Sequence, residues 1–148
     1  MLIRNHRQHP GDSFKRQEAS WRRAYAEAFS LRDRFPGVEQ IVADMTFIDV
    51  KETGHYSAQM RSFSASAKAF FAIACPRALC LEGGFNLDTV VTTMIAAQQS
   101  TAAGMLECAG WTEPSRSQHA HCLLQLSYRI HVTYDGTPRR RTPVGRVP

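Results

Sequence analysis

The sequence lacks the features that mark several large functional classes. No apolar run approaches the roughly 20 residues that a membrane-spanning helix needs, and Met1–Pro10 contains no apolar stretch typical of a signal peptide. There is no P-loop, dinucleotide-binding fingerprint or nucleophile elbow, and no internal repeat is evident. We therefore expect a cytoplasmic protein whose function does not depend on one of these motifs.

Positive charge is scarce where a nucleic-acid-binding domain would need it. The 148 residues carry a formal net charge of +5, but residues 1–35 contribute +4, residues 36–135 contribute −3 and residues 136–148 contribute +4. The central part is therefore mildly acidic, and a basic patch built into the fold is not expected. Nucleic acid could be contacted through the basic termini, where the tail includes Arg139, Arg140 and Arg141.

Composition and hydrophobic periodicity divide the chain into four parts. Residues 1–13 and residues 136–148 are polar and are expected to be disordered, the second as a basic tail. Residues 14–35 are predicted to form an amphipathic helix, and residues 36–135 an α+β domain that contains the cysteines. One face of the helix carries Trp21, Tyr25, Ala28 and Phe29. The helix either docks on the body through this stripe or binds a membrane surface or a partner.

The expected domain has the order strand, strand, helix, strand, strand. The first strand covers residues 38–50 and has one apolar face, and the second is centred on residues 69–75 and is apolar on both faces. The third covers residues 105–109, and the last, residues 122–134, is apolar at every second position. The intervening helix has an apolar stripe of Leu87, Val90, Val91, Met94 and Ile95. We predict a four-stranded mixed sheet with one packed helix, preceded by the N-terminal helix.

Four cysteines, all in the central domain, are the most informative residues of the chain: Cys75, Cys80, Cys108 and Cys122. A βαβ unit with parallel strands would place Cys75 and Cys108 at the same edge of the sheet. An antiparallel pairing of the last two strands would then put Cys122 beside Cys108, and Cys80 lies in the loop after the second strand. The predicted topology therefore gathers four thiols at one end of the sheet.

Four thiolates can close a tetrahedral zinc site, and a site with four protein ligands leaves no position for a reactive water. The cysteines therefore predict a structural Zn²⁺ site in a protein that is not an enzyme. The Cys-x4-Cys spacing is looser than the usual Cys-x2-Cys knuckle, and two other interpretations stay open. The thiols could be ordinary core residues, or Cys75 and Cys80 could form a redox pair or a disulfide.

Histidines and carboxylates are weaker candidates. His119 and His121 could replace one thiolate as a ligand, although solvated loop positions are the simpler interpretation. His55 falls in a segment expected to be a polar loop. Asp44 and Asp49 have an odd spacing and are expected on different faces of the first strand. No catalytic pair of carboxylates is therefore predicted.

The cysteine pattern resembles that of a family of small bacterial proteins without an assigned activity. The matching segments are Cys75-Pro-Arg-Ala-Leu-Cys80, Gly83-Gly84-Phe85-Asn86-Leu87, Cys108-Ala-Gly-Trp111 and the segment from Cys122 to Ile130. This chain has Asn86 where the family pattern has an acid. The resemblance covers about residues 38–134 and implies the four-cysteine set but no activity. The chain is also broadly similar to zinc-ribbon modules, although it lacks their short paired knuckles.

The sequence thus predicts a small zinc-binding protein that acts as a non-enzymatic interaction module. Its partner would be a protein, or a nucleic acid contacted through the basic termini. Two other functions remain open at this point. One is a thiol-based redox protein that uses Cys75 and Cys80, and the other is a nucleic-acid-binding module.

Overall fold

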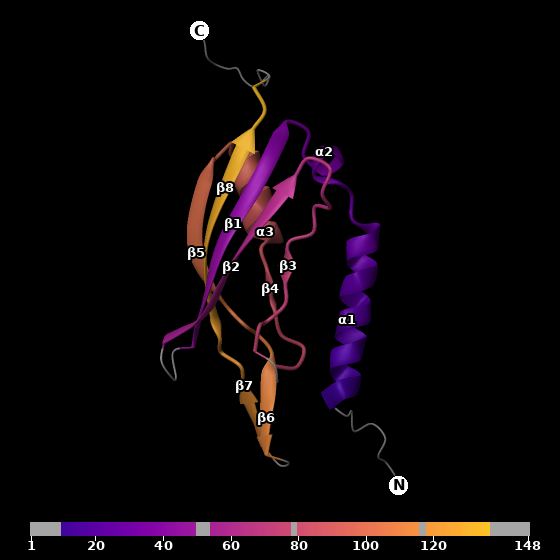
Figure 1. Cartoon of the computed structure of the whole chain (residues 1–148), viewed down its shortest axis with the longest axis vertical. Coiled ribbons are helices and arrows are strands. Elements are labelled where there is room, and N and C mark those ends of the chain that lie inside the picture. Colours follow the sequence, from indigo (N-terminus) through magenta and orange to yellow (C-terminus); the bar gives the residue numbers. More distant parts are fainter. Residues whose placement is uncertain (1–9, 50–53, 78–79, 116–117, 137–148) are drawn as a thin grey trace.

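The computed structural model describes residues 10–49, 54–77, 80–115 and 118–136. Its centre is a four-stranded sheet, and every neighbouring pair of strands in it is antiparallel (Figure 1). In spatial order the strands are β2 (Gly54–Ser64), β1 (Val38–Asp49), β8 (Gln125–Tyr134) and β5 (Thr101–Glu107). The two longest strand pairings, β1 with β2 and β1 with β8, place β1 in the interior of the sheet.

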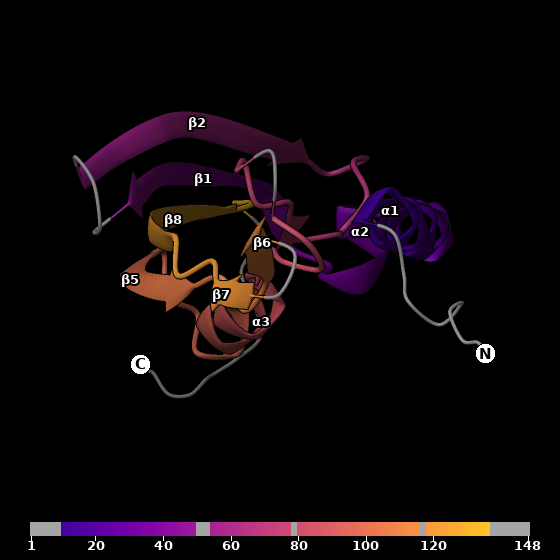
Figure 2. The ribbon, with the colours of Figure 1, turned by 90° about the horizontal axis from the view of Figure 1, so that it is seen from below.

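Three helices and two small hairpins complete the fold. The helices are α1 (Pro10–Glu27), α2 (Leu31–Arg34) and α3 (Asp88–Ala96). The hairpins pair β3 (Ala72–Ile73) with β4 (Phe85–Asn86), and β6 (Trp111–Ser115) with β7 (Gln118–His121). Figure 2 shows that the large sheet curves and that α3 lies on its concave side, with β6 and β7 beside it. No described helix is long and apolar enough to cross a membrane.

The core lies between the sheet and α3 because β1 and β8 each turn every second side chain inward. The paired residues on this face are Ile41 and Val132, Ala43 and Ile130, and Phe47 and Leu126. All six are at most 3% exposed. Val91 and Met94 of α3 are buried in the same cluster. Burial of a large apolar side chain contributes about 1.5–3 kcal/mol, so this face holds the sheet and the helix together.

Several sequence predictions are confirmed by this core. The chain is α+β and contains a four-stranded sheet. The apolar face expected on the first strand is buried at Ile41, Ala43, Met45 and Phe47. The helix stripe is also confirmed, since Leu87, Val91 and Met94 are buried and Val90 and Ile95 pack against the core. The antiparallel pairing of the last two strands, β5 and β8, is present as expected.

The prediction of a mixed sheet is wrong, because the sheet contains no parallel pair of strands among the described residues. The second long strand is β2, in a region expected to be mostly loop, whereas residues 69–75 contribute only the two residues of β3. The expected order of two strands, a helix and two strands is therefore not confirmed. β2 is an edge strand that pairs with β1 through its backbone. Its sequence therefore needs no strong apolar alternation.

The last strands also differ from the prediction in their limits. The third strand covers Thr101–Glu107 instead of residues 105–109. The fourth begins at Gln125 instead of Cys122, because Leu123 adopts a positive φ of 56° that interrupts the extended chain. The segment between them, expected to be a loop, contains the hairpin of β6 and β7. Cys122 and Leu124 are nevertheless buried in phase with Leu126.

The expected N-terminal helix is divided into α1 and α2. Ser30 begins α2, and its hydroxyl accepts a hydrogen bond from the Asp33 N–H at 3.1 Å. The Tyr25 ring makes an edge contact with Phe70, at 5.7 Å between centroids, so α1 is docked on the body. The Phe29 residue is 70% exposed, and its contact with the body is made by its carbonyl, which accepts a hydrogen bond from the Ala69 N–H at 2.8 Å. Residues 1–9 and 137–148 lie outside the described residues, and so does most of the expected basic tail.

A two-point ion pair joins α2 to the start of α3. The Arg34 guanidinium donates to both carboxylate oxygens of Asp88, at 2.7 Å and 2.9 Å. It also lies over the Phe35 ring, 4.7 Å from the centroid. The hydrogen bond from Arg34, together with its charge, lowers the pKa of Asp88. The pair therefore stabilises the fold above the unfolded-state pKa of about 3.9, and this contribution is lost as the pH falls through the lower folded-state value.

We expect Asp88→Asn to reduce the free energy of unfolding at pH 7 by about 0.5–1 kcal/mol, a small value because both side chains are partly solvated. The difference between the variant and the parent protein should shrink as the pH falls below the unfolded-state pKa of about 3.9, and it should vanish below the lower pKa of Asp88 in the folded parent protein. Urea unfolding at several pH values measures it. A difference that stays constant down to pH 3 would show that the ion pair does not carry the effect.

Candidate metal centre

The four cysteines come from three places in the fold and meet near the end of the large sheet where β5 ends and β8 begins. Cys75 and Cys80 belong to the loop that follows β3, Cys108 comes directly after β5, and Cys122 comes directly after β7. Because β5 and β8 are antiparallel, Glu107 at the end of β5 pairs with Gln125 at the start of β8. The chain segments just beyond these two residues therefore lie side by side.

The spacing of the sulfur atoms suits a shared metal ion. All four Sγ atoms lie within 4.8 Å of one another. Two contacts are resolved: Cys75 to Cys122 at 3.7 Å and Cys80 to Cys108 at 3.6 Å. Sulfurs placed at about 2.3 Å from zinc in a tetrahedron are about 3.8 Å apart, whereas a disulfide bond is about 2.05 Å long. The four cysteines are free thiols, and the two sulfur–sulfur distances given above are close to the separation in a tetrahedral site.

Backbone hydrogen bonds fix the three segments to one another. Leu81 and Trp111 exchange N–H to carbonyl bonds of 2.8 Å and 3.1 Å, which joins the loop after Cys80 to the loop after Cys108. The Cys108 N–H donates to the Leu124 carbonyl at 2.9 Å, and the Cys122 N–H donates to the Gly110 carbonyl at 2.9 Å. The positions of the sulfurs are thus set by main-chain pairing as well as by side-chain packing.

Two backbone N–H groups point at one sulfur. Gly84 and Gly110 donate to Cys108 Sγ, at 3.3 Å and 3.4 Å. Hydrogen bonds of this kind orient a ligand and stabilise its charged form. Cys108 is 2% exposed, so these donors replace solvent as partners of the sulfur. Among the four cysteines, Cys108 is therefore the position best prepared to hold a negative charge.

The pKa values of three of the thiols are shifted in different directions. The pKa of Cys108 is lowered, because its sulfur accepts hydrogen bonds from Cys75 and Cys80 and from the Gly110 and Gly84 N–H groups. The pKa of Cys75 is raised by its hydrogen bond to Cys108 and by burial. The pKa of Cys80 is raised by hydrogen bonds to Cys108 and Cys75 and by burial. A metal cation would be attracted to a single thiolate surrounded by thiols. Its binding would displace the protons of the other thiols.

A buried ion pair flanks the cluster on the side of Cys75. Arg77 donates to the Asp49 carboxylate at 2.7 Å, and Asp49, the last residue of β1, is 6% exposed. Burial lowers the pKa of Arg77, but the charges of Cys122, Asp49 and Cys75 raise it overall. Zinc with four thiolates has a net charge of about −2, which a nearby guanidinium partly offsets. The sequence reasoning missed Arg77, although it lies inside the Cys-Pro-Arg-Ala-Leu-Cys loop.

Two glycines were also missed as parts of the site. A Cβ at Gly83 would collide with the sulfurs of Cys80 and Cys108, and a Cβ at Gly110 would lie 2.5 Å from both Cys80 Sγ and the Gly83 Cα. The two loops therefore touch through glycine backbone. A signal was present in the sequence, because Gly83 follows Cys80 by three positions and Gly110 follows Cys108 by two.

The cysteines meet as expected, although the expected route through a parallel βαβ unit is wrong. β3 pairs antiparallel with β4, and β5 with β8, so the thiols converge through antiparallel hairpins. His121 is exposed and is not part of the cluster. The side chains of His119 and His55 lie outside the described residues, and Asp44 is exposed on β1.

Comparisons with models of protein families, with curated proteins and with solved structures find no match to this chain.

We expect Gly83→Ala and Gly110→Ala to lower metal content and to reduce the free energy of unfolding by about 1–3 kcal/mol, the usual cost of overpacking. Each added methyl group would occupy space held by a sulfur or by the facing glycine. Gly136→Ala is the matched control, since a Cβ there would meet nothing within 4 Å. Elemental analysis and urea unfolding provide the readouts. Equal metal content in all three variants would mean that the close loop contact is not needed for binding.

Proposed function

We propose that this protein binds zinc through Cys75, Cys80, Cys108 and Cys122, and that it serves as a non-enzymatic interaction module whose zinc site is structural. The observation that carries the proposal is the cluster of four free thiols within 4.8 Å of one another. A set of four sulfurs in this arrangement favours zinc or iron. Zinc is the ion we propose, because a closed four-thiolate site is typical of structural zinc.

A structural role follows from what the site would join. Between Cys75 and β4 the described residues form no helix or strand element, and the hairpin of β6 and β7 lies between Cys108 and Cys122. These segments have few partners in the large sheet. A metal ion bound by all four thiols would fasten both segments to the ends of β5 and β8. Four protein ligands would also leave no open position for water, which argues against hydrolysis.

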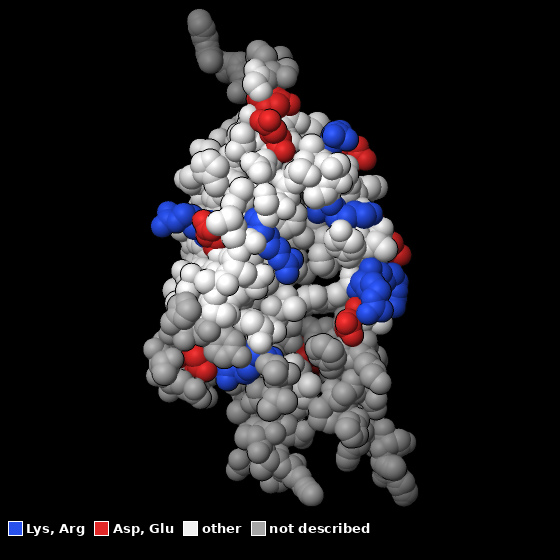
Figure 3. Space-filling model, in the orientation of Figure 1, with Lys and Arg blue, Asp and Glu red and all other residues white. Residues whose placement is uncertain are grey.

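The partner of the module stays a prediction. On the face seen in Figure 3, Lys and Arg side chains are separated and are interspersed with Asp and Glu, apart from a group of positive charges over α1. This distribution favours a protein partner over the phosphate backbone of a nucleic acid. The basic tail that would contact nucleic acid, Arg139 to Arg141 included, lies outside the described residues. Salt-dependent binding would be the mark of that second function.

Protein purified without added metal should contain about one zinc and no iron per chain, as four thiolates form one tetrahedral site. Elemental analysis of the purified chain measures both metals. Replacing all four cysteines by serine should abolish metal binding. Cys75→Ser alone should weaken it, because three thiolates remain. Zinc content below about 0.2 per chain, in protein that is folded by circular dichroism, would contradict the proposal.

Removing the metal should loosen the loops more than the sheet. We expect a chelator to increase amide hydrogen exchange in residues 74–84 and 108–124, because a bound metal would add to the few backbone hydrogen bonds that join these segments. β1 and β8 should keep most of their protection, since their shared apolar face does not need the metal. Hydrogen exchange measured by mass spectrometry gives both rates in one sample. A uniform increase across the chain would show that the metal supports the whole fold.

A further inference from the structure

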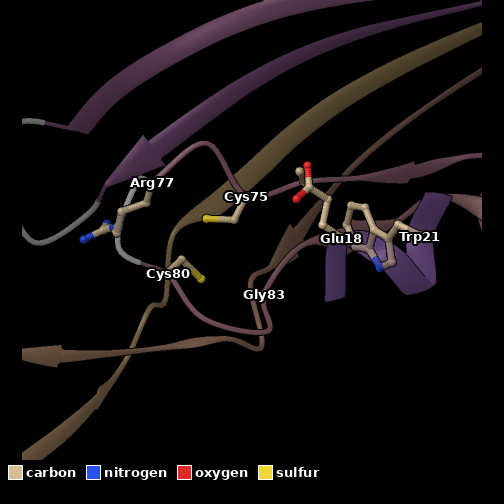
Figure 4. Close-up of a pocket in the computed structure, with 7 residues that line it drawn as sticks. Glu18, Trp21, Cys75, Arg77, Cys80 and Gly83 are labelled. Atoms are coloured by element: carbon tan, nitrogen blue, oxygen red, sulfur yellow. The ribbon is translucent and has the colours of Figure 1, made fainter. Parts of the chain in front are cut away.

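A cavity of about 180 Å³ lies between α1 and the cysteine cluster. Its walls are formed by Glu18, Trp21, Ala74, Cys75, Arg77, Cys80 and Gly83. Figure 4 shows that Glu18 and Trp21 come from α1, while Cys75, Arg77 and Cys80 lie on the loop across from them. The metal centre is therefore closed toward the sheet but has one side that faces a cavity.

Cys75 is the cysteine that this cavity leaves accessible. The other three are at most 7% exposed, whereas Cys75 is only partly buried. Cys80 also lines the cavity, but its sulfur is in contact with Cys108 Sγ and lies against Gly83 and Gly110. A small molecule that enters from solvent would therefore meet Cys75 Sγ first.

Helix α1 covers the cavity through Trp21. The Trp21 ring packs on Gly84, where a Cβ would lie 2.7 Å from the ring. Gly84 also has a φ of +141°, which residues with a side chain rarely adopt. Trp21 is the large apolar wall of the cavity and has no sulfur contact of its own among the described interactions. Its removal would open the cavity without removing any of the four thiols.

The lining selects small molecules without charge. Trp21, Ala74 and Gly83 offer apolar surface. The two charged residues of the lining each have an ion-pair partner, because Glu18 lies 3.5 Å from Arg22 and Arg77 lies 2.7 Å from Asp49. A water molecule occupies about 30 Å³ of liquid volume, so the cavity has room for a molecule of a few heavy atoms.

We propose that Cys75 is a modification site that reacts, through this cavity, with small uncharged electrophiles such as hydrogen peroxide. Access by way of the cavity is a property of the fold alone. The loss of metal described below rests on the proposed zinc centre. The thiolate is the nucleophilic form of cysteine and is also the form that binds a metal ion.

The reaction with peroxide has two steps. In the first, Cys75 Sγ attacks one peroxide oxygen, the O–O bond breaks, and hydroxide leaves, which gives a sulfenic acid on Cys75. In the second, the thiolate of Cys122, whose sulfur lies 3.7 Å from Cys75 Sγ, attacks the oxidised sulfur. A disulfide forms and a second hydroxide leaves. Two electrons pass from the two sulfurs to peroxide, and the metal centre loses two of its ligands.

This pairing differs from the one that the sequence suggested. The loop that contains both Cys75 and Cys80 favoured a redox pair of these two residues. In the structure, Cys75 contacts Cys122 and Cys80 contacts Cys108. The disulfide we expect therefore joins the loop after β3 to the segment before β8, and leaves Cys80 and Cys108 as thiols.

The first test is alkylation of the purified full-length protein with iodoacetamide, an uncharged electrophile, followed by peptide mass spectrometry. Cys75 should be labelled at least about tenfold faster than the other three cysteines, because access decides the rate when all four are ligands. Trp21→Ala should raise the Cys75 rate further. Phe29→Ala is the matched control, since Phe29 is an exposed aromatic residue of the same N-terminal segment that does not line the cavity. Equal rates at all four cysteines would overturn the proposal.

The second test treats the protein with hydrogen peroxide and measures disulfides and released zinc together. We expect a Cys75–Cys122 disulfide to appear at the same rate as free zinc. A first disulfide between Cys80 and Cys108 would overturn the assignment.

The two proposals fail in different ways. Protein with one zinc per chain and uniform labelling would refute the modification site and leave the zinc site standing. Protein without zinc in which Cys75 alone reacts would refute the zinc site and support the modification site.

Discussion

The contact between two glycine loops is the constraint on which the arrangement of the four cysteines depends. Gly83 and Gly110 approach so closely that neither position can carry a side chain, and the sulfurs of Cys80 and Cys108 fill the space around them. The bonds exchanged by Leu81 and Trp111 hold the loops in this contact. Because of it, the loop after β3 and the loop after β5 present their thiols to the same point.

Two sources of stability divide the molecule. The first part is the antiparallel sheet packed on α3, whose buried apolar face can keep it folded without a metal ion. The second part consists of the loops and short hairpins around the cysteines, and its buried residues include Cys80, Cys108 and Cys122. A bound metal ion would stabilise these loops, as apolar packing stabilises the sheet and α3.

The four cysteines differ in their exposure to solvent, and this difference affects their chemistry. Backbone N–H groups point at Cys108, deep in the site, whereas Cys75 faces a cavity that is covered by α1. The same four residues can therefore combine a firmly held ligand with an accessible one. The docking of a single helix then affects how readily the centre meets molecules from solution. A structural site and a site of modification are thus compatible uses of one cluster.

The sequence by itself determined which residues are buried in β1, β8 and α3, because the apolar periods of two and of 3.6 residues each fix one face of an element. It also singled out the four cysteines as a set. It could not determine the strand pairing. β2 is an edge strand without a strong apolar period, and residues 69–75 contribute only β3, in a separate two-stranded sheet, while Ala69, Phe71 and Ile73 are buried in the core. Which thiols touch, and which one remains accessible, was decided only by the tertiary structure. Those facts depend on loops brought together through glycine contacts and backbone pairing between segments far apart in the chain.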